Sequence, residues 1–233
     1  MHGHGGKWPW NCWAGRLHST REIHQIINIF NGDYTKWIDR FSKTPESIWL
    51  LNDLGHSGVG WGWEDSGLTI EPNKDPKQIK DIVIEVSSKK VDQVEYQNEP
   101  WWVSTHYMKA YHPDRDKWKA QSFILTEEDI SEDIMLIRDL IKEKFHPEAR
   151  LHVIPHLNLK KSATEGYIES RNELTNWLDA ACNKHDVNFC NVGKEIEENY
   201  KKPWLDICMP DSTHYAASHG LVMEFINSKT TNK

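Results

Sequence analysis

The sequence predicts an α/β fold, a three-layer α/β/α sandwich with a mostly parallel sheet of about five strands. Segments with apolar residues at helical spacing alternate with short apolar runs typical of buried strands. No internal repeat and no low-complexity linker interrupts this alternation. We therefore expect one domain that covers residues 1–233.

The first half of the chain supplies three of these elements, after a strand expected around residues 7–11. Ser19 and Glu22 have the spacing of a capping box, and apolar residues follow them at helical intervals. Residues 48–51 predict a buried strand, with a glycine-rich loop after it. A helix is expected from Pro76, because proline suits a first helical turn. Its apolar residues would be Ile79, Ile82, Val83 and Val86.

The second half continues the alternation. Residues 91–96 predict a further strand, and residues 99–125 predict a long irregular loop of the kind that often carries function. Thr126 and Asp129 indicate a helix start, and apolar residues continue that helix to Phe145. The remaining expected elements are a strand at 151–157, a helix at 167–181, a strand at 187–192 and a helix at 214–227.

Composition and charge exclude several classes of protein. The net charge is −7, from 28 basic and 35 acidic residues, and no basic block indicates a nucleic-acid partner. No apolar run is long enough to span a membrane. Residues 1–7 lack the apolar core of a secretory signal, so we expect a cytoplasmic location. The four cysteines have no CxxC spacing, so neither a zinc site nor a redox pair is expected. The chemistry suggested below requires no metal or other cofactor.

The twelve tryptophans are numerous for this length and leave two interpretations open. They pack in the core and at its rim, or some of them form stacking platforms for a sugar-like ligand. The candidates for the second role are Trp61, Trp63, Trp101 and Trp102.

Polar clusters at the predicted strand ends suggest nucleophilic chemistry, because ligands of parallel sheets bind beyond the carboxyl ends of the strands. Cys12 precedes a predicted helix, whose N-terminus favours a thiolate. His214 is the best candidate for its base, and Asp211 could orient the imidazole. Taken alone, however, a cysteine in a chain of this length is more often a small buried apolar residue than a nucleophile.

Two further residues could stabilise an oxyanion. The Gly58 backbone N–H and the Asn98 amide suit the negative charge that develops during acyl transfer. The alternative is that both are ordinary turn residues. Ser57 is a secondary candidate for the nucleophile.

The order of the clusters resembles the SGNH hydrolase superfamily, also called GDSL-type hydrolases. That superfamily has a nucleophile turn, a glycine block, a Gly-x-Asn-Asp block and a final Asp-x-x-His block. The blocks of this chain are residues 10–14, 52–58, 96–99 and 211–214. Cys12 stands where the superfamily has serine, as in the GSCFA-like group and the capsule-polysaccharide acetyltransferase group.

This resemblance implies a flavodoxin-like sandwich and a Cys12, Asp211 and His214 triad. The Cys12 N–H, the Gly58 N–H and the Asn98 side chain would form the oxyanion hole. The implied function is hydrolysis or transfer of a small O-acyl group on a carbohydrate ester. The alternatives are an acyl-CoA-dependent O-acetyltransferase of polysaccharide biosynthesis, the one case with an acyl-CoA donor, and a non-catalytic carbohydrate-binding protein.

Overall fold

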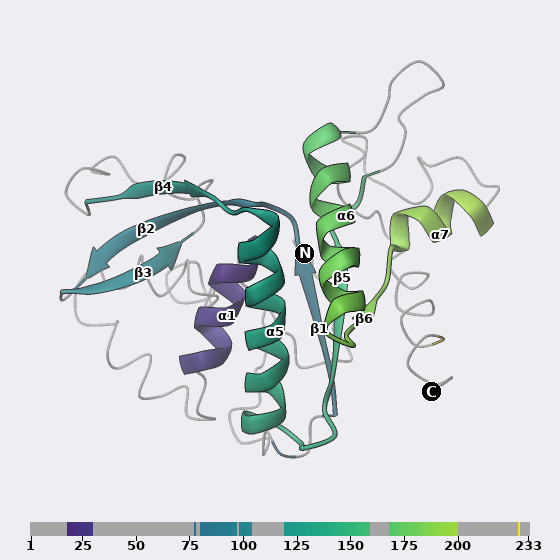
Figure 1. The fold of residues 1–233 in the computed structure, drawn as a ribbon, viewed down its shortest axis with the longest axis horizontal. Coiled ribbons are helices and arrows are strands. Elements are labelled where there is room, and N and C mark those ends of the chain that lie inside the picture. The colour runs from purple at the N-terminus through teal and green to yellow at the C-terminus, as the bar shows by residue number, and fades with distance from the viewer. Residues whose placement is uncertain are drawn as a thin grey trace, which may run out of the picture. The chain divides into compact units, whose positions relative to one another are not determined.

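The computed structural model describes residues 18–29, 77, 80–96, 98–103, 119–158, 168–199 and 228 (Figure 1). This part of the chain mixes helices and strands. The chain divides into two compact units, one of Met1–Ile82 with Lys89–Arg150 and the other of Val83–Ser88 with Leu151–Lys233. Single-domain organisation over the whole chain stays a prediction.

The described part of the first unit combines an antiparallel sheet with two helices. Helix α1 (Thr20–Ile29) lies beside α5 (Glu127–Lys144), and α1 also contacts β3 (Figure 1). The sheet contains β2 (Lys90–Tyr96), β3 (Glu99–Val103) and β4 (Gln121–Ile124) in the order β3-β2-β4. Tyr96 pairs with Glu99, so β2 and β3 form a hairpin with a tight turn.

The two helices of this unit begin and pack as their sequences predict. Glu22 Oε2 accepts a hydrogen bond from the Ser19 N–H at 2.9 Å, and Ser19 Oγ accepts one from the Glu22 N–H. This reciprocal pair confirms the expected capping box. A second capping box joins Thr126 and Asp129 at the start of α5. The buried face of α5 consists of Ile130, Ile134, Ile137 and Ile141, with Phe145 after the helix.

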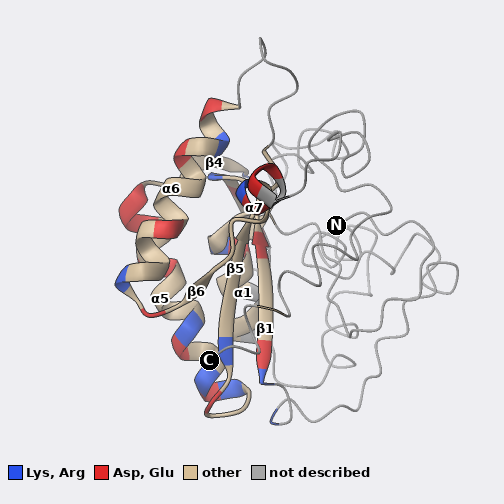
Figure 2. Cartoon of the chain, turned by 90° about the vertical axis from the view of Figure 1, so that its right-hand side faces the viewer, with Lys and Arg blue, Asp and Glu red and all other residues tan. Residues whose placement is uncertain are grey.

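The sheet associated with the second unit has the order β1-β5-β6, and α6 links the last two strands. These strands are β1 (Asp81–Val86), β5 (Arg150–Pro155) and β6 (Asn188–Phe189), and the helices are α6 (Glu169–Lys184) and α7 (Val192–Asn199). Pairing of β5 with β6 is parallel. Figure 2 shows β1 and β5 side by side.

Backbone hydrogen bonds show that β1 and β5 are also parallel. The Arg150 N–H donates to the Lys80 carbonyl at 2.8 Å, and the His156 N–H donates to the Val86 carbonyl at 2.9 Å. Donor and acceptor both move forward by six residues, which occurs only when two strands run in the same direction. The predicted α/β class with a parallel sheet is thus confirmed for the described residues.

Between residues 76 and 125 the predicted helix and the predicted irregular loop are wrong, while the predicted strand is present with a different pairing. A helix was expected from Pro76 onward, but Asp81–Val86 form strand β1. Ile84 and Val86 are buried in this strand, while Val83 is exposed. This alternation has the period of a strand, and β-branched residues favour it. Residues 91–96 do form a strand, but it is antiparallel to both of its neighbours. The expected irregular loop at 99–125 contains β3 and β4.

The later elements agree with the sequence. Strand β5 and helix α6 lie where they were expected, with Leu174, Leu178 and Ala181 on the buried side of α6. The strand expected at 187–192 is only the two residues of β6, and α7 begins at Val192. The elements expected at 7–11, 48–51 and 214–227 lie outside the described residues. Among the described helices, none is long and apolar enough to cross a membrane.

Candidate active site

Most of the site residues predicted from the sequence lie outside the described part of the chain. These are Cys12, Ser57, Gly58, Trp61, Trp63, Asp211 and His214. The structure describes Asn98, Trp101 and Trp102, all in the hairpin of β2 and β3.

Asn98 lies in the turn of that hairpin. It is exposed, and its backbone φ of 63° is in the left-handed region, which asparagine adopts more readily than other residues with a side chain. The expectation that it follows a strand of the parallel sheet is wrong, because β2 belongs to the antiparallel sheet. The topological reason for grouping Asn98 with the other clusters is therefore lost, and its role as an oxyanion donor stays a prediction.

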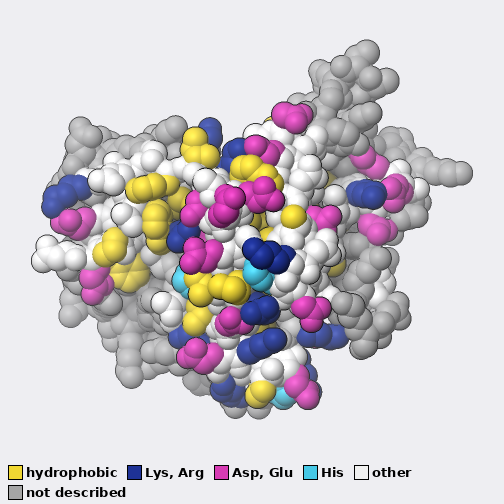
Figure 3. All heavy atoms as spheres, viewed as in Figure 1, with side chains coloured by type: hydrophobic (Ala, Val, Ile, Leu, Met, Phe, Trp, Pro, Cys, Tyr) yellow, Lys and Arg dark blue, Asp and Glu magenta, His cyan; other side chains and the backbone are white. Residues whose placement is uncertain are grey.

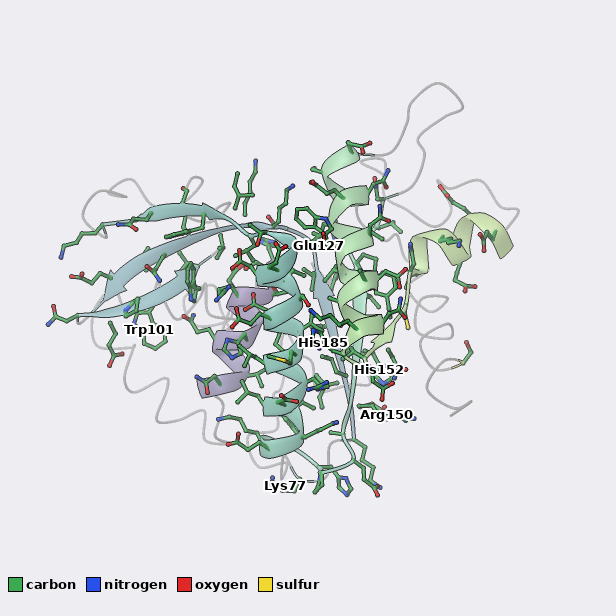
Figure 4. All side chains as sticks on the ribbon, in the orientation of Figure 1. Lys77, Trp101, Glu127, Arg150, His152 and His185 are labelled. Carbon is green, nitrogen blue, oxygen red and sulfur yellow. The ribbon has the colours of Figure 1, made fainter. Side chains whose placement is uncertain are left out.

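The two tryptophans are engaged in packing. Trp101, labelled in Figure 4, is only 5% exposed. The Trp102 ring meets Phe123 edge-on at 5.3 Å between centroids, and the Arg21 guanidinium lies 5.5 Å from its centroid. Gln25 of α1 accepts a hydrogen bond from the Trp102 N–H and donates one to its carbonyl. These contacts favour core and rim packing over ligand stacking for this pair.

The carboxyl end of the parallel sheet carries a polar cluster that the sequence analysis did not predict. Because the His156 N–H binds the Val86 carbonyl, His156 lies opposite Ser87 across the two strands. Glu85 and Ser87 are two residues apart and share a face of the sheet. His156 Nδ1 lies 2.6 Å from Glu85 Oε1, which places its side chain on that face too.

The Glu85–His156 pair is shielded from water without being sealed off. The side chains are 15% and 16% exposed, respectively. An ionised Glu85 only accepts hydrogen bonds, and the imidazole then donates to it from Nδ1. By contrast His152, labelled in Figure 4 on β5, is fully buried. The contact with Glu85 therefore orients the His156 ring at the carboxyl end of β5.

The chain that follows His156 is held in place by side chains. Asn158 Nδ2 donates to the Ile168 carbonyl, and Asn158 Oδ1 accepts from the Ile168 N–H at 3.0 Å. Arg171, in the first turn of α6, donates to the Leu157 carbonyl at 2.8 Å. These bonds connect the end of β5 to the start of α6 and restrict the position of the backbone beside His156.

Buried acids in the first unit form a second polar cluster. Burial raises the pKa of Glu22 to about 7, although hydrogen bonds from Ser19 and His18 lower it. The Asp92 carboxyl adds to the rise. Burial also raises the pKa of Asp133 to about 6, although Arg21 and Thr20 oppose this shift. Arg21 Nε lies 3.2 Å from Asp133 Oδ1, and Thr20 Oγ1 donates to Asp133 Oδ2 at 2.8 Å. This cluster links α1 to α5.

Neither cluster has the composition of a metal centre. Within the residues that the structure describes, no group of three or more His, Cys, Asp or Glu side chains could hold a metal ion.

The outer surface over α5 carries acidic and basic side chains together (Figure 3). That mixture is typical of a solvated helix face.

The two described cysteines are core residues, as expected. Cys182 and Cys190 are both buried and have free thiols. Burial raises the pKa of Cys182 to about 12, with Asp179 adding to the rise. A thiol of this kind is a poor nucleophile, since the thiolate is the reactive species.

Sequence reasoning missed Glu85 because it assigned residues 79–86 to a helix, and it did not single out His156, although it predicted the strand that ends beside it. The signal was available at the end of Asp81–Val86, where Glu85 stands between the apolar β-branched residues Ile84 and Val86. The chain matches no family model, curated protein or solved structure.

Proposed function

We propose that this chain is an acyl-ester hydrolase or acyltransferase that acts on a small O-acyl group of a carbohydrate. Cys12 is the nucleophile, His214 its base, and Asp211 the residue that orients His214. The proposal rests on the order of the four sequence blocks. It is supported by the parallel strands β1, β5 and β6, whose carboxyl end carries polar side chains. Ligands of open α/β sheets bind at that end.

The chemistry follows from the residue types. The Cys12 sulfur bonds to the acyl carbon while His214 takes the thiol proton. The Cys12 and Gly58 N–H groups stabilise the oxyanion, which collapses as the alcohol leaves with the proton from His214. Water or an acceptor hydroxyl then gives its proton to His214 and bonds to the acyl carbon. The bond between that carbon and the Cys12 sulfur breaks, and the sulfur takes the proton from His214, which regenerates the thiol.

The test combines a chemical label with an ester assay. Limiting iodoacetamide near pH 7 should label Cys12 before Cys208, and His214→Ala should slow Cys12 labelling by about tenfold as its thiolate fraction falls. Cys182 and Cys190 should stay unlabelled in the folded protein, because both are buried. Cys12 should also be acylated by p-nitrophenyl acetate, with a burst of nitrophenol.

Two controls decide the result. Cys12→Ser should abolish the label and the burst, whereas Cys208→Ser should change neither. Cys12 labelling at the same rate with and without His214, or a burst that survives Cys12→Ser, would overturn the assignment.

A further inference from the structure

Glu22 places a carboxyl in the interior of the first unit. It is fully buried on α1, close enough to the buried Asp92 of β2 for the two carboxyls to interact. Glu22 Oε2 accepts hydrogen bonds from the N–H groups of His18 and Ser19 and from Ser19 Oγ. Among the described residues, the buried Oε1 atom of Glu22 has no hydrogen-bond partner. A buried oxygen of this kind is costly when the carboxyl is ionised, so a proton on Glu22 favours the observed packing.

The charged groups that the neighbouring described elements bring to α1 are mostly acids. They are Asp92 on β2, Asp129, Glu132 and Asp133 on α5, the exposed Glu99 on β3, and the cation Lys144 at the end of α5. The Arg21 guanidinium of α1 lies 3.2 Å from both Asp129 and Asp133, so it already serves two acids. Burial therefore raises the pKa of Glu22 to about 7, and Asp92 adds to the rise.

Side chains make the hydrogen bonds that join α1 to its neighbours. Gln25 accepts from the Trp102 N–H at 2.8 Å and donates to the Trp102 carbonyl at 3.0 Å. In an antiparallel pair, the N–H and carbonyl of one residue point together toward the partner strand or together away from it. Because both groups of Trp102 bind Gln25, they point away from β2. Helix α1 thus occupies the outer edge of β3 at Trp102.

Helix α1 is less firmly anchored than α5. It has 10 residues, of which Ile23 and Ile27 are buried, whereas α5 has 18 residues and a face of four buried isoleucines. Elements with little buried apolar surface open at a lower free energy than the core does. An opening of α1 that leaves α5 folded is therefore accessible to this unit.

We propose that α1 is a pH-sensitive cover of the β3 edge, closed while Glu22 carries a proton and opened when that proton passes to solvent. Ionisation puts a negative charge in a buried site next to the Asp92 carboxyl, and movement of α1 away from β2 returns the carboxylate to water. The N–H and carbonyl of Trp102 then lose Gln25, and this edge of β3 is exposed. The switch lies within the first unit and does not depend on the proposed acyl chemistry.

Amide hydrogen exchange of the whole chain tests the switch. Protection is measured at pH 6 and pH 8 for α1, Trp102 and α5, with correction for the pH dependence of the chemical exchange step. The pKa of Glu22 is about 7 in the closed form and returns toward 4.5 on opening. The loss of protection in α1 and at Trp102 between these pH values should therefore be about tenfold larger in the native protein than in Glu22→Gln.

The comparison between the two proteins removes the effects of neighbouring groups. Asp133, whose pKa burial raises to about 6, titrates at the lower end of this window. His24, whose pKa burial lowers, acts in the opposite direction, and both residues are present in both proteins. Glu127→Gln is the matched control, because Glu127 is an exposed acid in the first turn of α5 (Figure 4). It should keep the native pH dependence.

Two results of the exchange experiment would overturn the inference. One is the same pH dependence of α1 protection in the native protein and in Glu22→Gln. The other is equal protection of α1 and α5 at pH 8, because the two helices would then open together in global unfolding. We expect protection to be at least about tenfold lower in α1 than in α5.

Should Glu22→Gln fail to fold, ¹³C NMR of the native protein decides. A Glu22 carboxyl that titrates above pH 6, in step with the loss of α1 protection, supports the switch. A carboxyl that titrates at lower pH overturns it.

Discussion

The two compact units use buried charge in contrasting ways. In the first unit, Asp133 is fully buried and bonded to Thr20 and Arg21, so that its carboxyl joins α5 to α1. In the second unit, Glu85 and His156 keep some contact with solvent at the ends of strands that the backbone already joins.

The comparison distinguishes a buried charge that holds two helices together from partly exposed charges between strands that the backbone already joins. Two helices have no backbone hydrogen bonds between them, so side chains such as Asp133 and Arg21 must set their relative position. Removing one should therefore reduce stability. Adjacent strands need no such link, so replacing Glu85 should lower the free energy of unfolding less than replacing Asp133 does.

The largest expected effect concerns Asp133, the buried carboxyl that joins α5 to α1. Asp133→Ala should lower the free energy of unfolding by about 2–3 kcal/mol, because it leaves the buried Thr20 hydroxyl without its acceptor and leaves Arg21 with only its Asp129 partner. Urea unfolding followed by circular dichroism measures the change. Asp139→Ala is the control, since Asp139 is 54% exposed beside Arg138 on the same helix. It should cost less than about 1 kcal/mol. Equal losses in the two variants would show that the buried link is not structural.

A smaller effect concerns pH. The pKa of Glu22 is raised from 4.5 to about 7, so the folded chain holds a proton that the unfolded chain releases. Stability is therefore greatest at low pH and falls as the pH rises from about 4.5 through 7. Asp133, with a pKa raised to about 6, adds to the fall in the lower part of this window.

Glu22→Gln isolates the contribution of Glu22, because glutamine is neutral and also suits a capping box. Between pH 5 and pH 8 the native chain should lose on the order of 2 kcal/mol more stability than the variant. Urea unfolding at several pH values checks this. Parallel curves for the two proteins would mean that Glu22 is ionised in the fold throughout.

What the sequence predicts well is local structure with a strong periodic or capping signal. The isoleucine face of α5 and the capping box at Ser19 follow from spacing alone, and both are present. Strand β5 is also correct, because a run buried on both faces is apolar throughout.

What it predicts poorly depends on contacts between distant residues. Residues 81–86 suit a helix or a strand by composition, and pairing with β5 decides in favour of a strand. The same uncertainty misplaced Asn98, since it follows a strand of the antiparallel sheet, whereas Glu85 and His156 lie at the carboxyl end of the parallel one. Strand direction is set by partners that no local pattern reveals.

The smallest expected effect concerns Asn98 and tests whether this hairpin belongs with the structural or the chemical residues. Its φ of 63° suits glycine, so Asn98→Gly should change the free energy of unfolding by less than about 0.5 kcal/mol. Asn98→Ala should cost about 1 kcal/mol, because alanine resists this conformation. If Asn98 is a turn residue, the glycine variant keeps its turnover of p-nitrophenyl acetate. An oxyanion donor would instead cost roughly 100- to 1000-fold in turnover in both variants, whatever their stability. Because β2 lies outside the parallel sheet, we expect the first result, and the second would return Asn98 to the catalytic site.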